Sequence, residues 1–444
     1  MKGNTDLLKA DIGKIFFRYC IPSIAGVVSV SSYIFFDTMF IGQGVGAEGL
    51  AALNIVLPLY NLFNALAFLF GMGGATVLSI SKGKNDKEAE HKVFTYSLVI
   101  GIISGAILTL ICLVCLDNIA MFLGANSENI NLVKEYMRII MIMPIGFILN
   151  PMLSIFIRND KAPQLAMWSM ILSSLSNIIL DYILVFPLGM GMKGAALATF
   201  VSPIVGIIII STHFTKKSCT LKLNFNKVDF GILKRLILGG IPSFIMEMSG
   251  GIVIFAFNIT IHKYLGNLGI SAYSIIANIG LIFVSIFNGI AQAAQPIISI
   301  NHGAKLEKRV LKLLKISDFT ALVFGVVFFM TGMLFPKILI RIFSKDLSLI
   351  DITTRGIYLY FIAFIFMGIN IITTIYFQSI ENHRASTIMS ISRGIGGILL
   401  GLLMIPMILE VDGVWLTVPF AEIITFIIGI SILFSKKQFI KEFK

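Results

Sequence analysis

Long apolar segments of about 20 residues recur between Ile15 and Phe434, and they constrain this chain more than any other feature. A helix rises about 1.5 Å per residue, so about 20 residues match the roughly 30 Å hydrocarbon core of a bilayer. Only 13% of the residues are charged, against about 25% in typical soluble domains. The sequence therefore predicts an all-α polytopic membrane protein. A membrane barrel is not expected, because the segments are continuously apolar rather than alternating.

We expect twelve transmembrane helices at the positions of these segments. Adjacent segments are separated by short polar or glycine-containing stretches, which serve as loops. The predicted cores are 15–40, 50–80, 93–116, 132–157, 165–186, 194–214, 236–261, 270–300, 312–335, 352–377, 385–409 and 414–434.

The basic residues fall mainly on one side of these spans. Of the 35 Lys and Arg, 26 lie in the segments on the side of the N-terminus or in the first turn of the spans that begin there, five lie in the opposite loops, and four lie elsewhere within spans. Cytoplasmic loops of membrane proteins carry an excess of Lys and Arg. We therefore expect a multi-pass plasma-membrane protein with both termini in the cytoplasm. The net charge of +12 then reflects topology and contact with anionic lipid rather than nucleic-acid binding.

The chain also repeats itself at a shift of 220 residues without gaps. The matches include Pro22 with Pro242, Gly46 with Gly266, and Gly83 with Gly303. Each half has six spans, so the halves have the same orientation and form a parallel repeat about an axis along the membrane normal. We expect an N-terminal six-helix bundle over 1–214, a cytoplasmic connector over 215–235 and a C-terminal six-helix bundle over 236–444.

Two prolines occupy equivalent places in the repeat, Pro22 in the first span and Pro242 in the seventh. Proline removes a backbone hydrogen bond and bends a helix. A static bend and a moving hinge both fit this pattern, so Pro22 and Pro242 are hinge candidates.

Acidic residues inside the spans are candidates for function, because a charge at the bilayer centre costs about 2.5–3.5 kcal/mol on insertion scales. Four of the acids inside the spans matter most, namely Asp37, Asp181, Glu247 and Glu422. Asn177 lies four residues before Asp181 and so shares its helical face. A proton- or cation-binding role is expected for Asp181, with a hydrogen-bonded carboxylate that holds helices together as the alternative. Glu422 is expected to be a packing residue, and Arg393 a partner for a nearby acid.

These residues and the repeat resemble the multidrug and toxic compound extrusion (MATE) family of cation-coupled transporters. The resemblance covers essentially the whole chain, and the segment from spans 5 and 6 is its most specific part. The matching segments are FFDTMFIGQGVGAEGLAALNIVLP, SNIILDYILVFPLGMGMKGAALAT and LGGIPSFIMEMSG.

The resemblance implies two bundles in a V around a central cavity, and export of amphipathic, often cationic, drug-like compounds by alternating access. Matched residue by residue, it implies a site for a coupling H⁺ or Na⁺ at Asp37, Asn177, Asp181 and Thr199. No other metal site is expected. Glu247 matches an acidic position that some relatives use for substrate contact or cation coupling. Several relatives carry a further carboxylate in span 10, which this chain lacks, and its absence favours the N-terminal site.

Two other functions fit parts of the sequence. A transporter of lipid-linked saccharides or cell-wall precursors shares the architecture, but such chains often have 14 spans and basic cavities. A membrane-embedded enzyme needs a nucleophile with its base or clustered metal ligands, and none is evident. The stretch GMGGATVLS lacks the Lys-Ser/Thr ending of a P-loop, so ATP is not expected. We expect a monomer without an organic cofactor that works with small molecules and membrane lipid.

Overall fold

The structure, a computed structural model, describes residues 7–126, 129–343 and 346–435. Within these ranges, nine helices are long and apolar enough to cross a bilayer, and two pairs of shorter helices form bent spans. The longest helix, α9 (Phe230–Gly303), is broken at Gly266 and crosses twice. The described chain thus has twelve spans, and the predicted all-α membrane fold is confirmed.

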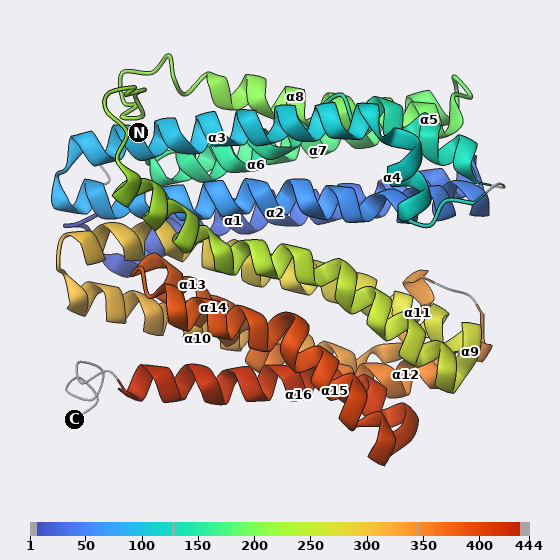
Figure 1. The fold of residues 1–444 in the computed structure, drawn as a ribbon. Helices are drawn as coiled ribbons and strands as arrows, with labels where there is room; N and C mark the ends of the chain where they lie inside the picture. Colours follow the sequence, from blue (N-terminus) through green and yellow to red (C-terminus); the bar gives the residue numbers. More distant parts are fainter. Residues whose placement is uncertain (1–6, 127–128, 344–345, 436–444) are drawn as a thin grey trace.

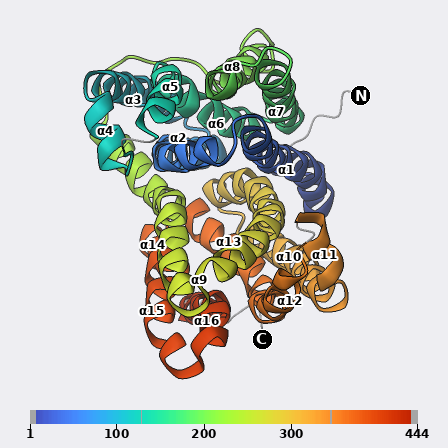
Figure 2. The ribbon, with the colours of Figure 1, turned by 90° about the vertical axis from the view of Figure 1, so that its right-hand side faces the viewer.

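The helices form two groups that lie side by side when the molecule is viewed along its length (Figure 2), and each group has its own hydrophobic core. The first group contains α1 (Ile12–Gly44), α2 (Ala47–Lys84), α3 (Lys87–Val114), α4 (Leu116–Phe122), α5 (Ile130–Ile140), α6 (Pro144–Asn159), α7 (Pro163–Val185) and α8 (Gly191–Ser211). The second contains α9, α10 (Glu307–Leu334), α11 (Pro336–Phe343), α12 (Ser348–Tyr360), α13 (Ala363–Ser379), α14 (His383–Ile391), a π-helical turn (Ser392–Gly396), α15 (Gly397–Met404) and α16 (Pro406–Ser435).

The backbone repeats with the period seen in the sequence. Residues with positive φ recur 220 positions apart, at Gly46 and Gly266, Asn85 and Lys305, and Lys161 and Glu381. Gly266 has φ 59° and reverses the direction of α9. A straight helix of its 74 residues would be about 110 Å long, far longer than a bilayer is thick. The internal repeat is therefore confirmed.

Two spans that the sequence predicts as single helices, 132–157 and 352–377, are bent. The angle is 55° between α5 and α6 and 45° between α12 and α13. At the first bend, Pro144 begins α6. The proline lacks an N–H and restricts the residue before it, so the preceding helix ends there. Nothing in the structure explains the second bend.

The starts of α1 and α9 pack into the opposite halves. Ile12 and Phe16 of α1 belong to the hydrophobic core of the second half. Ile232 and Leu236 of α9 belong to the core of the first half. The two helices therefore cross from one half to the other in equivalent ways.

The two halves meet closely at the end of the molecule that carries residues 212–229, which join α8 to α9 (left in Figure 1). The expected connector was 215–235, but α8 ends at Ser211 and α9 begins at Phe230. From here on we call residues 212–229 the connector and this end the connector end. A Cβ on Gly83 of α2 would lie 2.2 Å from the carbonyl oxygen of Ile300, and one on Gly303 of α9 would lie 2.2 Å from that of Ile80. Only glycine permits this approach of two backbones. The connector end is therefore closed.

Candidate functional site

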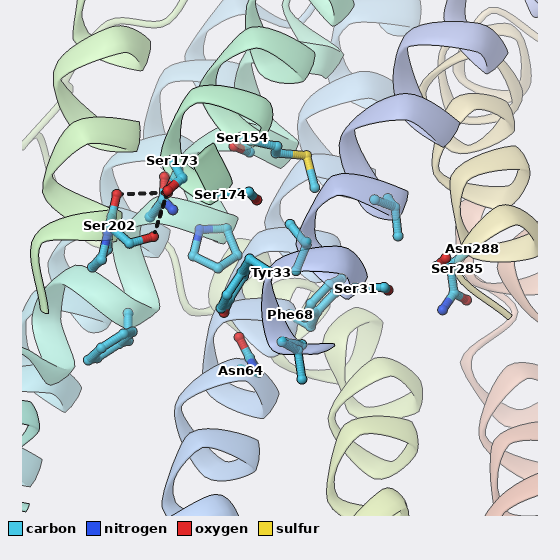
Figure 3. A pocket seen from close by; sticks show the side chains of 18 of the residues that line it. Ser31, Tyr33, Asn64, Phe68, Ser154, Ser173, Ser174, Ser202, Ser285 and Asn288 are labelled. Carbon is cyan, nitrogen blue, oxygen red and sulfur yellow. Dashed lines mark hydrogen bonds between the residues drawn. The ribbon is translucent and has the colours of Figure 1, made fainter. Parts of the chain in front are cut away.

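A cavity of about 270 Å³ lies between the two halves. Its walls come from α1, α2, α6, α7 and α8 on one side and from both arms of α9 on the other. Phe68, Phe147 and Met170 contribute apolar surface. Small hydroxyl and amide side chains line much of the remainder (Figure 3), including Ser31, Asn64, Ser154, Ser173, Ser174, Ser202, Ser285 and Asn288. An apolar wall with a few polar groups is typical of small-molecule sites.

Asp37 of α1 and Asp181 of α7 come together inside the first half. Asp181 is fully buried and Asp37 is 8% exposed, and the two carboxyl groups lie close enough for each to influence the charge of the other. One turn before Asp181, Asn177 donates from Nδ2 to Oγ1 of Thr199 on α8 at 3.3 Å. The structure thus brings the four predicted coupling residues into one neighbourhood, which we call the acid-pair site.

Several oxygen atoms of the acid-pair site have no hydrogen-bond partner in the described chain. They are Oδ1 of Asp37, both carboxylate oxygens of Asp181 and Oδ1 of Asn177. Buried polar atoms are nearly always satisfied, and two adjacent buried carboxylates repel each other unless a positive charge offsets them. Carboxylate, amide and hydroxyl oxygens are the ligands that hard cations prefer. The residues present therefore fit a bound proton or sodium ion.

The acid-pair site and the cavity share a wall. Thr199, Ser174 and Tyr33 line the cavity, whereas Asp37 and Asp181 lie behind this wall. Thr199 accepts the hydrogen bond from Asn177, and the Tyr33 phenol lies within electrostatic range of both carboxylates. Movement of α1 or α7 on cation binding would therefore change the shape of the cavity.

Glu247 lies in the other wall of the cavity, on the first arm of α9. Among the described residues it has no charged or hydrogen-bonding partner. Arg158 of α6 is the other charged residue in the described lining. Glu247 is thus separate from the acid-pair site. Its carboxylate can contact a ligand bound in the cavity.

The arrangement of twelve spans in two repeated halves around this cavity matches one family throughout. The MatE family model matches residues 22–183 and again residues 242–403, the same 220-residue shift that relates the two halves. This chain belongs to the MATE family.

Relatives of this MATE chain include two proteins named multidrug export protein MepA. The one from Staphylococcus saprophyticus is 28% identical over 393 residues, which cover 87% of this chain and 86% of that protein. The one from Staphylococcus aureus strain MSSA476 is 27% identical over 388 residues, with 87% and 86% covered. The fold agrees with a solved outward-facing multidrug resistance MATE transporter, with TM-score 0.90, 24% identity and 97% of this chain and 96% of that chain covered. The chain is therefore a multi-pass MATE transporter.

The two hinge candidates of this MATE chain occupy matching positions. Pro22 lies buried inside α1 and Pro242 lies buried inside α9. Each proline follows the segment that packs into the opposite half. A bend at either proline would therefore change how one half is tilted against the other.

Arg393 was expected to pair with a nearby acid, and the structure shows that this acid is Glu422. Nε of Arg393 donates to Oε1 of Glu422 at 2.8 Å, and Asn370 donates to Oε2 at 2.7 Å. Both carboxylate oxygens thus have partners, so Glu422 connects α16 to α13 and to the π-helical turn. This agrees with the expected packing role.

Sequence reasoning missed a buried polar cluster that holds the connector. Asp160 accepts hydrogen bonds from Lys82 at 2.6 Å, from the Thr220 hydroxyl at 2.6 Å, and is 2.7 Å from Nε2 of His213. Burial alone would raise the pKa of Asp160, but the contacts with His213, Lys82 and Thr220 outweigh it and hold that pKa well below its usual range. The carboxylate therefore stays ionised at neutral pH and anchors the connector to the first half.

The same cluster brings ligand-type atoms of Asp160, His213 and Cys219 within 4.8 Å of one another. No such grouping was predicted from the sequence. The Lys82 ammonium already lies 2.6 Å from Asp160, and a second cation beside it would be repelled. The cluster is therefore better explained as an anchor for the connector than as a metal centre.

Tyrosines and an arginine of the site were also missed. Tyr60 and Tyr136 have hydroxyls 3.1 Å apart, and Tyr136 lies near Asp37 and Thr199. The predicted fourth span ends at 157, so charge counting assigned Arg158 to a loop. The structure instead buries Arg158 in the cavity wall, with 2% of its surface exposed. The position of Arg158 at the end of an apolar segment was the one sequence feature that could have indicated its burial.

Proposed function

We propose that this chain exports amphipathic, mainly cationic, drug-like compounds across the plasma membrane as an antiporter driven by H⁺ or Na⁺. The observation that carries the proposal is the Asp37–Asp181 pair, whose unsatisfied oxygens lie behind the wall of a cavity between two repeated halves. The multidrug export proteins among the relatives support the substrate class. One chain encloses the cavity, which supports a monomeric transporter.

The coupling follows from a difference in affinity between two states. Cation occupancy removes repulsion between Asp37 and Asp181, so it favours whichever packing of α1 and α7 holds these carboxylates together. Substrate in the cavity favours the packing whose wall fits it. A gradient can drive export only if the cation and the substrate have different affinities for the two states. The shared wall at Tyr33 and Thr199 is where the two sites influence each other.

Transport by the purified protein in liposomes tests this proposal. Separate pH and sodium gradients are imposed on vesicles that contain a fluorescent organic cation. We expect uphill movement under at least one gradient, and none in liposomes without protein. Saturable downhill movement that ignores both gradients would contradict coupled antiport. The lipid-linked precursor alternative gains no support from the cavity, which carries one acid and one base rather than a basic wall.

The orientation is part of the proposal, with the connector end in the cytoplasm. We expect Cys at position 48, introduced as Glu48→Cys, to react with an impermeant maleimide on intact cells. Lys217→Cys in the connector should react only after permeabilisation. Both positions are exposed, and the four native cysteines are replaced first. Glu48 is preferred to Gly46 because Gly46 has φ 94°, which disfavours any side chain. The reverse labelling pattern would contradict the orientation.

Glu247 is expected to select for positive charge on the substrate. Because the carboxylate lies in the cavity wall and has no partner among the described residues, Glu247→Gln should weaken binding of a monocationic dye by about tenfold or more. Binding of a neutral compound of similar size should change by less than about twofold. Affinities measured in detergent, without any gradient, separate this effect from coupling. The exposed Glu48→Gln is the matched control, and equal losses for both compounds would contradict a substrate-facing charge.

A further inference from the structure

The last part of the connector carries a large apolar surface that no described part of the chain covers. Residues 219–229 are not helical, and Leu221 among them is buried in the core of the first half. The large apolar side chains that follow, up to the first residue of α9, are all more than half exposed: Leu223 at 52%, Phe225 at 74%, Val228 at 56% and Phe230 at 76%. Exposed apolar residues gathered in this way mark a surface that contacts a membrane or another molecule.

The same stretch is positively charged. Asp229 is its one acid between residues 216 and 234, and the Asp229 carboxylate accepts hydrogen bonds from the N–H groups of Gly231 and Ile232 at the start of α9. Five exposed lysines form no ion pair with any described acid: Lys216, Lys217, Lys222, Lys227 and Lys234. Basic residues interleaved with exposed apolar ones are typical of a segment that lies in the head-group region of an anionic bilayer.

Two hydrogen bonds hold the connector against α3 (Figure 1). The backbone N–H of Asn224 donates to Oγ1 of Thr95, and that of Asp229 donates to the phenol oxygen of Tyr96, both at 2.8 Å. Ile103 and Ile107 lie seven and eleven residues after Tyr96, so they share its helical face, and each is 51% exposed. This face of α3 is the one that meets the hydrocarbon. The connector therefore crosses the end of a lipid-facing surface, at the level of the head groups.

We propose that residues 222–230 form an interfacial anchor that binds anionic phospholipids of the leaflet at the connector end. The exposed apolar side chains enter the boundary between head groups and acyl chains, and the lysines pair with the lipid phosphates. Lipid is the occupant favoured by the position, because the anchor continues the lipid-facing side of α3. The anchor holds the start of α9 at the membrane surface. It does not depend on which compound the cavity exports.

Quenching of a fluorophore on the connector tests the depth of the anchor. On a background without the native cysteines, the full-length Phe225→Cys protein is labelled with nitrobenzoxadiazole and placed in lipid nanodiscs, both faces of which are open to solution. We expect strong quenching by phosphatidylcholine spin-labelled in the head group or at the top of the acyl chain, and weak quenching by iodide in the water. Lys84→Cys, at the exposed end of α2, is the matched control and should show the reverse pattern.

Two pairs of lysine substitutions test the role of charge. The nanodiscs contain equal amounts of either spin-labelled phosphatidylglycerol or spin-labelled phosphatidylcholine. Each lysine near an anionic surface adds about fivefold to lipid affinity, so phosphatidylglycerol should quench the label at position 225 at least about twofold more strongly. Lys222→Gln combined with Lys227→Gln should remove this preference. Lys305→Gln combined with Lys308→Gln removes the same charge from exposed positions at the connector end of the second half, and should keep it.

Each contrary result identifies what fails. Quenching of the label at position 225 by iodide alone would place the connector in water and overturn the proposal. Protection from both iodide and spin-labelled lipid would mean that protein covers the anchor, and a doubled particle mass would identify that protein as a second copy. Equal quenching by the two lipids, or equal loss of the preference in both lysine pairs, would overturn the specific binding of anionic lipid. Coupled transport in liposomes is measured separately, so none of these results bears on the proposed function.

Discussion

In liposomes with an imposed ion gradient, we expect Asp181→Asn to reduce uphill export of an organic cation to the level of protein-free vesicles. Asparagine keeps the size and hydrogen-bonding capacity of the side chain but cannot exchange a proton and carries no charge for sodium. Asp181 is fully buried and both of its oxygens lack a hydrogen-bond partner in the described chain. The substitution removes the repulsion with Asp37, so one packing is favoured whether or not the cation is present.

Substrate binding should survive this change, because Asp181 lies behind the cavity wall. We expect the affinity for the cation in detergent to stay within about tenfold of wild type, since no direct contact with substrate is lost. Asp37→Asn should have the same effect on export. The exposed Asp351→Asn on α12 is the control. Uphill export at the wild-type rate by both Asp181→Asn and Asp37→Asn would reject the coupling site and return Asp181 to a structural role.

The spans, the repeat and the shared helical face of Asn177 and Asp181 could be predicted from the sequence. Each depends only on the spacing of residues along one helix or on a fixed shift of 220 residues, and both can be read directly from the sequence. The match of Gly46 with Gly266 is an example. Both residues have positive φ, which the turn requires and which glycine adopts at little cost. The residue type therefore indicates the backbone conformation directly.

Contacts between helices could not be read in this way. The approach of Asp37 to Asp181 depends on how α1 packs against α7, and no spacing within either helix encodes it. Arg158 was misplaced because the end of a span is defined only to within a few residues. The connector anchor at Asp160 was missed for a third reason. It combines groups from α2, α6 and the connector. No single one of these segments has a pattern that indicates the contact.

The closed connector end should depend on two glycines related by the repeat. A side chain on Gly83 or Gly303 would begin 2.2 Å from a backbone carbonyl oxygen of the opposite half. Backbone cannot rotate away as a side chain can, so the halves must separate or the helices must shift. Overpacking of this kind costs about 1–3 kcal/mol, which changes a two-state population by roughly five- to 150-fold. We therefore expect Gly83→Val and Gly303→Val to favour a state open at the connector end and to lose most export.

Accessibility of the interface distinguishes this opening from simple unfolding. Ser79 is buried one turn before Gly83, where its hydroxyl donates to Oδ1 of Asn159 at 2.6 Å. On a background without the native cysteines, Ser79→Cys should react with a maleimide at least about tenfold faster when Gly83→Val is also present. Gly250→Ala is the matched control, because a Cβ there meets nothing within 4 Å. Substrate binding by Gly83→Val in detergent shows that the protein is folded. Unchanged export and unchanged labelling in both valine variants would show that backbone contact at the connector end does not control access to the cavity.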